Sequence, residues 1–97
     1  MGSARRILDE KRDDILRLAA LHGAGRVRVF GSVARGEDGP DSDIDLLVHM
    51  DDDRSLLDLI GFWQAVQDLV GCKVDVVSDG GISPTLRDAV LAEARPL

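Results

Sequence analysis

The sequence predicts a small two-layer α/β (α+β) domain, in which helices pack on one face of a mixed β-sheet and the opposite face stays open. Short segments with alternating polar and apolar residues, typical of strands, are separated by longer segments with helical spacing. The predicted strands are also apolar on one face and charged on the other. Sheets that carry helices on both faces have strands that are apolar throughout, so this alternation favours a single covered face.

The first predicted element is a helix that begins at Ser3, a suitable N-cap, and ends before Gly23. Its apolar residues recur at helical spacing: Leu8, Ile15, Leu18, Ala19 and Leu21. A strand follows at residues 26–30, where polar and apolar side chains alternate. Residues 31–36 leave room for about one helical turn.

The middle of the chain is predicted to form a second strand and a second helix. A Gly-Pro-Asp turn at residues 39–41 leads into the strand at 43–49. An acidic loop at 51–53 follows, and either its last aspartate or Ser55 can cap the helix at 56–70. Four apolar residues of that helix are expected to be buried: Leu57, Ile60, Val66 and Val70.

The last part of the chain adds a strand at 73–77 and a final helix. Ser83 and Pro84 favour a helix start, because proline suits the first helical position. The helix is expected to run to about Ala94, with an apolar side formed by Leu86, Val90 and Leu91. No linker or internal repeat divides the chain, so we expect residues 1–97 to form one domain.

Side chains along the three predicted strands alternate between the two faces of the sheet. One face collects apolar residues: Val27, Val29, Ile44, Leu46, Val48, Val74 and Val76. The other face collects charged residues: Arg26, Arg28, Asp43, Asp45, Lys73 and Asp75. The helices are therefore expected on the apolar face.

Composition excludes several classes of protein. The 97 residues carry 12 basic and 18 acidic side chains, a net charge of −6, which disfavours sequence-independent binding to nucleic acid. No apolar run approaches the ~20 residues that span a bilayer. The single cysteine, Cys72, suits a reducing compartment, and no secretory signal is visible. We therefore expect a cytoplasmic protein with neither a membrane nor a nucleic-acid partner.

Asp43 and Asp45 lie two residues apart on a predicted strand, so their side chains leave the same face with Cα atoms ~6.5–7 Å apart. Carboxylates this close repel each other, and aspartate is depleted in strands, which disfavours a purely solvent-facing role. Mg²⁺ would relieve the repulsion, since it binds one or two carboxylates together with substrate phosphates. If Asp75 lies on a neighbouring strand, the three carboxylates could hold two metal ions ~3.5–4 Å apart.

Gly31 and Ser32 directly follow a predicted strand and open a helical turn, where backbone N–H groups are exposed to an anion. Gly31 has no Cβ, so a phosphate can approach its backbone closely, and the Ser32 hydroxyl adds a donor. A short connection can bring this loop beside Asp43. A triphosphate could then be held by the loop at one end and by metal at the other. Arg35 can either reach a phosphate or pair with an acidic neighbour, and the sequence leaves both roles open.

The string Phe30-Gly31-Ser32, ten intervening residues, and then Asp43-Ile44-Asp45 resembles the nucleotidyltransferase signature of the DNA polymerase β-like superfamily. Residues 26–48 as a whole are similar to the minimal nucleotidyltransferases of prokaryotes. Val74-Asp75-Val76 fits the third acidic strand of that family. The resemblance implies the polymerase β-like nucleotidyltransferase fold, with its active site on the open face of the sheet.

The resemblance also implies a role for each residue. Gly31 and Ser32 would bind the β- and γ-phosphates of a nucleoside triphosphate. Asp43 and Asp45 would ligate two Mg²⁺ ions, and Asp75 would ligate the catalytic ion and help to activate the acceptor hydroxyl. Such enzymes transfer a nucleoside monophosphate from the triphosphate to a hydroxyl and release pyrophosphate.

In the minimal family the partner is commonly a HEPN-domain toxin, and the transferase acts as its antitoxin by adding AMP from ATP to a toxin tyrosine. The present chain contains no tyrosine, so such an acceptor would lie on another protein. Two alternatives remain open. One is a non-catalytic antitoxin that blocks its toxin sterically. The other is a nucleotidyltransferase acting on a small molecule or an RNA end, which the lack of a second, substrate-binding domain disfavours.

Four further residues are not assigned to the catalytic site. Lys73 is expected to be a solvated strand lysine, and His49, near a strand end, is expected to be exposed. Phe62 and Trp63 are neighbours on one helix and cannot both enter the core. One of the two is therefore a candidate for a surface that contacts a partner.

Overall fold

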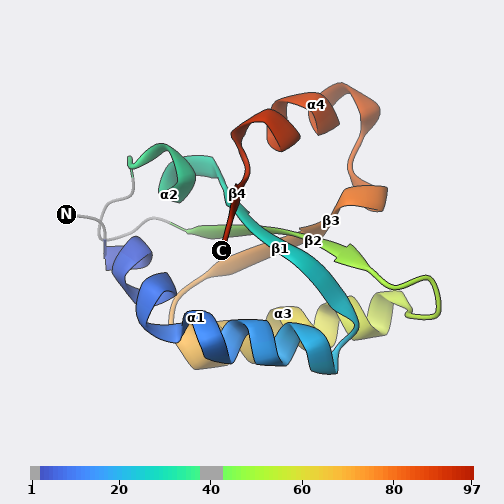
Figure 1. Ribbon diagram of the computed structural model, residues 1–97, viewed down its shortest axis with the longest axis horizontal. Helices are drawn as coiled ribbons and strands as arrows, with labels where there is room; N and C mark the ends of the chain where they lie inside the picture. The colour runs from blue at the N-terminus through green and yellow to red at the C-terminus, as the bar shows by residue number, and fades with distance from the viewer. Residues whose placement is uncertain (1–2, 38–42) are drawn as a thin grey trace.

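The computed structural model describes residues 3–37 and 43–97 (Figure 1). The predicted turn at residues 39–41 lies outside this part of the chain. The elements follow in the order α1 (Ser3–Leu21), β1 (Ala24–Phe30), α2 (Gly31–Arg35), β2 (Ile44–Met50), α3 (Leu56–Val70), β3 (Val74–Ser78), the 3₁₀ turn η1 (Asp79–Gly81), α4 (Pro84–Glu93) and β4 (Arg95–Pro96).

The strands form one mixed sheet in the order β3-β2-β1-β4. β2 and β3 are parallel, whereas β1 runs antiparallel to both β2 and β4. The predicted fold class, an α/β domain with a small mixed sheet, is therefore confirmed. The short strand β4 was not predicted, because its two residues become a strand only by pairing with Arg28 and Val29. None of the described helices is long and apolar enough to cross a membrane.

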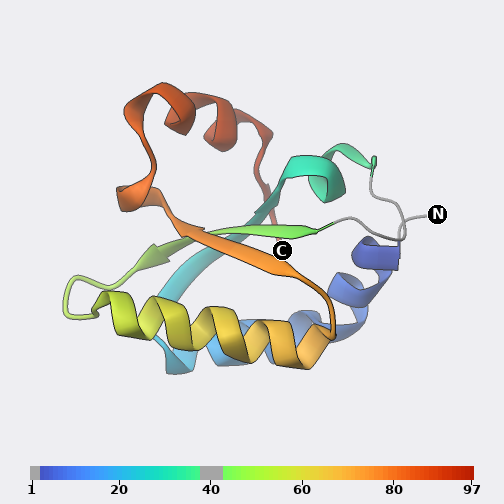
Figure 2. The ribbon, with the colours of Figure 1, turned by 180° about the vertical axis from the view of Figure 1, so that it is seen from behind.

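α1 and α3 lie together on one face of the sheet, and α2 and α4 lie on the other side (Figures 1 and 2). The second face is thus less open than the strand pattern predicts. That pattern reports only on strand side chains and cannot place a helix that covers a face without packing tightly against it. α4 is such a helix, since none of its residues is buried.

The hydrophobic core lies between the sheet and the α1–α3 layer. The strand residues predicted to be apolar and inward-facing are all buried: Val27, Val29, Ile44, Leu46, Val48, Val74 and Val76. The helices and the start of β1 add further residues to this core: Ala4, Leu8, Ile15, Ala19, Ala24, Val33, Phe62, Val66 and Val70. The strand alternation therefore identified the packed face correctly.

Local sequence signals set both ends of α3 where they were predicted. The Ser55 side chain accepts a hydrogen bond from the Leu57 N–H, and the Asp58 carboxylate accepts one from the Ser55 N–H at 3.0 Å, which forms a capping box. These contacts hold the pKa of Asp58 below its usual range, mainly through the hydrogen bond from the Ser55 backbone. At the other end, Gly71 adopts a left-handed conformation with φ +72° and stops the helix.

Two leucines of the helices that cover the core are exposed. Leu57, predicted to be buried, is 78% exposed, so that prediction was wrong; Leu21, one of the apolar residues at helical spacing in α1, is 69% exposed. At 100° per residue, Leu57 lies about 140° around α3 from Phe62, which is fully buried. Trp63 is 37% exposed and donates its indole N–H to the Val74 carbonyl, so only Phe62 of the adjacent aromatic pair enters the core.

A bulge in β1 sets the register that matters for the site. Ala24 pairs with Met50, but the register shifts by one residue before Arg28, next to Arg26 with φ +48°. If the register at Ala24 continued along β1, Phe30 would pair with Ile44 and not with Asp45. With the bulge, Phe30 pairs with Asp45 itself, and the core residues of the two strands stay on the same face.

Candidate active site

One row of residues crosses the sheet at the predicted site. Phe30, the last residue of β1, pairs with Asp45 on β2, and Asp45 pairs in parallel with Asp75 on β3. Paired residues of neighbouring strands share a face, and adjacent strands lie about 4.8 Å apart, so the two carboxylates leave the sheet side by side. The sequence analysis made a site with three carboxylates depend on Asp75 lying on a strand next to Asp45, and the structure has this arrangement.

The surroundings of Asp45 oppose its negative charge. Its partial burial raises the pKa of the carboxyl above the ordinary value, and the nearby charges of Asp75 and Asp43 raise it further. Asp43 lies just before β2, and its carboxylate is 3.5 Å from the Lys73 ammonium. Lys73 is therefore a surface lysine that neutralises one member of the acidic group.

The donor chemistry of this group fits a divalent cation, because carboxylate oxygens are the ligands that Mg²⁺ prefers. A cation would also relieve the repulsion that the charges of Asp75 and Asp43 exert on the Asp45 carboxylate. Across residues 3–37 and 43–97, however, no three His, Cys, Asp or Glu side chains come close enough together to hold a metal ion. Asp43 is instead paired with Lys73.

The loop beside the acids begins at Gly31, which has φ +74°. A Cβ built on Gly31 would lie 2.3 Å from Asp45 Oδ2, so the absence of a side chain lets the Asp45 carboxylate lie against the backbone. The half-buried Ser32 follows in α2. Gly36, with φ +73°, ends this short helix. The loop predicted to receive phosphates is thus next to the acidic pair.

The loop donors are occupied by a residue that the sequence analysis did not single out. The Gly31 N–H donates to Glu93 Oε2 at 3.0 Å, and the Arg35 guanidinium donates to Glu93 Oε1. Arg35 also donates to Glu37 Oε2 at 2.8 Å. Of the two roles left open for Arg35, the structure shows pairing with acidic neighbours. The Arg35 and Gly31 hydrogen bonds hold the pKa of Glu93 below its ordinary range.

One weak signal for Glu93 exists in the sequence. Glu93 is the last residue of α4, where a negative charge is disfavoured by the helix dipole. An acid at this position indicates that a partner outside the helix compensates it. The identity of that partner depends on how α4 folds back over the sheet, which no local pattern shows.

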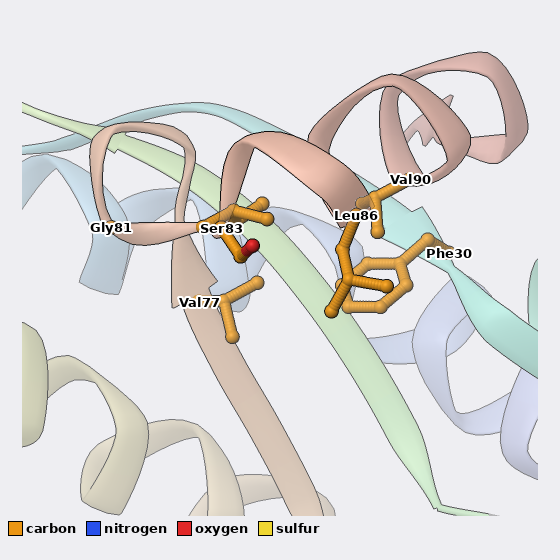
Figure 3. A pocket seen from close by; sticks show the side chains of 7 residues that line it. Phe30, Val77, Gly81, Ser83, Leu86 and Val90 are labelled. Atoms are coloured by element: carbon orange, nitrogen blue, oxygen red, sulfur yellow. The ribbon is translucent and has the colours of Figure 1, made fainter.

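A cavity of about 310 Å³ lies between α4 and the sheet, on the same face as the acids (Figure 3). Leu86 and Val90 of α4 lie over Phe30, the neighbour of Gly31, and Val77 of β3 also lines the space. Its lining is mainly apolar. The site therefore combines a charged row and an apolar space under one helix.

His49, predicted to be exposed, is exposed and lies outside this row. Its Nδ1 is 3.0 Å from Asp79 Oδ1, and the Arg28 guanidinium is 3.9 Å from the other oxygen of that carboxylate. The three side chains attach η1 to β1 and β2. We therefore assign them to the fold and not to the candidate site.

Comparison with known proteins identifies the family. Residues 8–97 match the model of the nucleotidyltransferase domain family. The chain is 38% identical over 87 residues to the Methanocaldococcus jannaschii "Putative protein adenylyltransferase MJ0435", covering 90% of this chain and 94% of that protein. It is 37% identical over 71 residues to the "Protein adenylyltransferase MntA" of Thermococcus cleftensis, covering 73% of this chain and 72% of that protein.

Solved structures agree with this result. The chain superposes with a TM-score of 0.87 and 50% identity on a structure described as a "putative minimal nucleotidyltransferase", covering 100% of this chain and 97% of that one. A toxin–antitoxin crystal structure with AMP-PNP shares the fold, with a TM-score of 0.75, 22% identity, and coverage of 87% of this chain and 69% of that chain. The chain therefore belongs to the nucleotidyltransferase family, as an enzyme of the minimal nucleotidyltransferase type.

Proposed function

We propose that this chain transfers AMP from ATP to a hydroxyl group of a partner protein, and that it thereby acts as the antitoxin of a HEPN-type toxin. The observation that carries this proposal is the row formed by Asp45 and Asp75 beside the Gly31 loop. Relatives at 37–38% identity bear the name protein adenylyltransferase, which supports a protein as the acceptor.

The proposed roles follow from position. Gly31, Ser32 and Arg35 bind the phosphates of ATP through the backbone N–H, the hydroxyl and the guanidinium. Asp43, Asp45 and Asp75 hold Mg²⁺, with Asp75 directed toward the acceptor. When bound, Mg²⁺ supplies positive charge that offsets the charge of the triphosphate and of the departing pyrophosphate.

In the proposed reaction, the acceptor hydroxyl oxygen attacks the α-phosphorus of ATP. The new P–O bond forms as the bond from the α-phosphorus to the bridging oxygen breaks, and pyrophosphate leaves with that oxygen. Asp75 accepts the hydroxyl proton. Its position next to Asp45 would place the acceptor and the triphosphate on the same face of the sheet.

The identity of the acceptor rests on two further observations. The chain has no tyrosine, so a tyrosine acceptor must belong to another protein. The fold neighbour solved with AMP-PNP is a toxin–antitoxin structure, which is consistent with a toxin partner. We place the reaction in the cytoplasm, where ATP is available and the single Cys72 stays reduced.

Mass spectrometry tests the proposal directly. The purified chain, ATP, Mg²⁺ and the candidate toxin should give a toxin mass increase equal to that of AMP. Asp43→Asn combined with Asp45→Asn should abolish the increase while circular dichroism shows an intact fold. Modification that persists in the double variant would overturn the assignment. Full neutralisation of the toxin by the inactive variant would favour the sterically blocking antitoxin.

A further inference from the structure

We propose that Glu93 is an internal competitor for the nucleotide, whose carboxylate occupies the phosphate-binding donors of the loop and keeps ATP affinity low until Glu93 leaves them. The inference rests on the proposed phosphate-binding role of Gly31 and Arg35. It concerns a residue outside the signature residues of the family. The consequence is an autoinhibited resting state of this chain.

The contacts of Glu93 match those expected of a phosphate. One carboxylate oxygen accepts the Gly31 N–H at 3.0 Å, and the other accepts the Arg35 guanidinium. Both oxygens are thus used, by donors that lie 62 and 58 residues away along the chain. A carboxylate and a phosphate are both anionic oxygen acceptors, so they cannot occupy these donors together. The nucleotide must therefore displace Glu93.

The helix that carries Glu93 packs loosely against the sheet, although β4 directly after it is paired with β1. No residue of α4 is buried, and Leu86 is 59% exposed. Beneath α4 lies the cavity of about 310 Å³ that also contacts Val90 (Figure 3). Movement of α4 would therefore expose little packed core. The contacts of Glu93 with Gly31 and Arg35 join α4 to α2. The chain after α4 stays paired with β1 through β4, so release of Glu93 requires a shift of its side chain and of the last turn of α4, with β4 kept in place.

The contact with Arg35 stabilises the charge of Glu93, in addition to occupying the donors of the loop. Its negative charge at the end of α4 is disfavoured by the helix dipole, and Arg35 compensates that charge. Binding of a nucleotide and release of Glu93 are consequently linked. By thermodynamic reciprocity, any change that pulls Glu93 from the loop should tighten nucleotide binding by the same factor as the nucleotide weakens the Glu93 contact.

Glu37 provides a matched control. Its carboxylate accepts a hydrogen bond from Arg35 at 2.8 Å, as Glu93 does, but the Gly31 N–H donates to Glu93. Glu93→Gln and Glu37→Gln remove the same charge and preserve side-chain size. A general electrostatic effect on the triphosphate would appear equally in both variants, whereas release of the loop would appear only in Glu93→Gln.

Isothermal titration of the full chain with AMP-PNP and Mg²⁺ tests the inference. Glu93→Gln should lower the Kd about tenfold, which corresponds to about 1.4 kcal/mol at 25 °C, and Glu93→Ala should lower it at least as much. Glu37→Gln should stay within about twofold of the wild type. In ¹⁵N-resolved NMR spectra without nucleotide, the Gly31 amide resonance should shift in Glu93→Gln and remain in place in Glu37→Gln.

The outcomes separate this inference from the proposed function. Nucleotide binding of equal strength in the wild type and in both Glu93 variants would overturn the internal competitor and leave the proposed function standing. Equal gains in Glu93→Gln and Glu37→Gln would also overturn it. A lower melting temperature of Glu93→Gln without tighter binding would show a merely structural tether. Failure of every variant and of the wild type to bind AMP-PNP would overturn the proposed function and this inference together.

Discussion

The two faces of the sheet differ in how their side chains relate to folding. On the face covered by α1 and α3, Val29 and Leu46 are buried in a continuous core. On the face beneath α2 and α4, Asp45 and Asp75 lie side by side, and the pKa of Asp45 is raised, mainly by burial. The first face stabilises the fold, and the second tolerates charge repulsion that opposes folding.

This division explains how so short a chain can carry a site with repelling carboxylates. Burial of apolar surface on one face is the main source of stability. The other face is packed less extensively: Leu47 is buried on it, but α4 buries none of its residues. Departures from good packing are expected at functional sites. Substitutions on the two faces should therefore affect different properties.

The largest expected effect is on activity. Asp45→Asn combined with Asp75→Asn should reduce AMP transfer at least about a thousandfold, because two of the three carboxylates proposed to hold the metal are removed. Without Mg²⁺, the melting temperature should not fall, since two repelling charges are also removed. The initial rate of toxin modification and a thermal melt measure the two effects. A melting temperature lowered by several degrees would contradict the division between the faces.

On the packed face, Phe62→Ala should lower the free energy of unfolding by about 3–5 kcal/mol, because this fully buried ring leaves a cavity. Leu57→Ala on the same helix should change it by no more than about 0.5 kcal/mol, since Leu57 is exposed. Urea denaturation measures both. If Phe62→Ala does not fold, Phe62→Leu should still fold and lose about 1.5 kcal/mol or less. Equal losses at positions 57 and 62 would disprove the assignment of the packed face of α3.

The comparison becomes sharper at two glycines with nearly the same conformation. Gly31 and Gly36 have φ of +74° and +73°, so an alanine at either position should cost about 1–2 kcal/mol of stability. Only at Gly31 would the new Cβ meet the Asp45 carboxylate, since nothing lies within 4 Å of a Cβ at Gly36. Gly31→Ala should lower activity about a hundredfold by displacing that carboxylate, and Gly36→Ala should leave it nearly unchanged. Similar activity losses would argue against the close contact.

The smallest effect concerns the cap of α3. Ser55→Ala should cost about 1 kcal/mol of stability at pH 7. Asp58→Asn should also destabilise the protein at pH 7, because the folded pKa of Asp58 is lowered by the Ser55 backbone hydrogen bond. This contribution is complete above the unfolded pKa and is lost as the pH falls through the folded pKa. Urea titrations should therefore show the wild type and Asp58→Asn converging below about pH 4. A difference that is independent of pH would contradict the role of the carboxylate.

Local patterns predicted the helices α1 to α4, the strands β1 to β3 and the packed face, but not β4, because the predicted features depend on residues close in sequence. The helix at 56–70 was predicted with its observed bounds, since the capping box and Gly71 act within a few residues. Strand alternation identified the core face for the same reason. Leu57 was misplaced because apolar character alone does not define position around a helix.

The candidate site residues could be named from the sequence alone: Gly31, Ser32, Asp43, Asp45 and Asp75 stand in a spacing typical of nucleotidyltransferases. The way these residues come together depends on the tertiary structure. The bulge beside Arg26 selects Phe30 as the partner of Asp45, and the parallel pairing of β2 and β3 places Asp75 next to it. The return of α4 across the sheet brings Glu93 onto the loop. Strand register and helix return depend on contacts between distant segments, which no local periodicity contains.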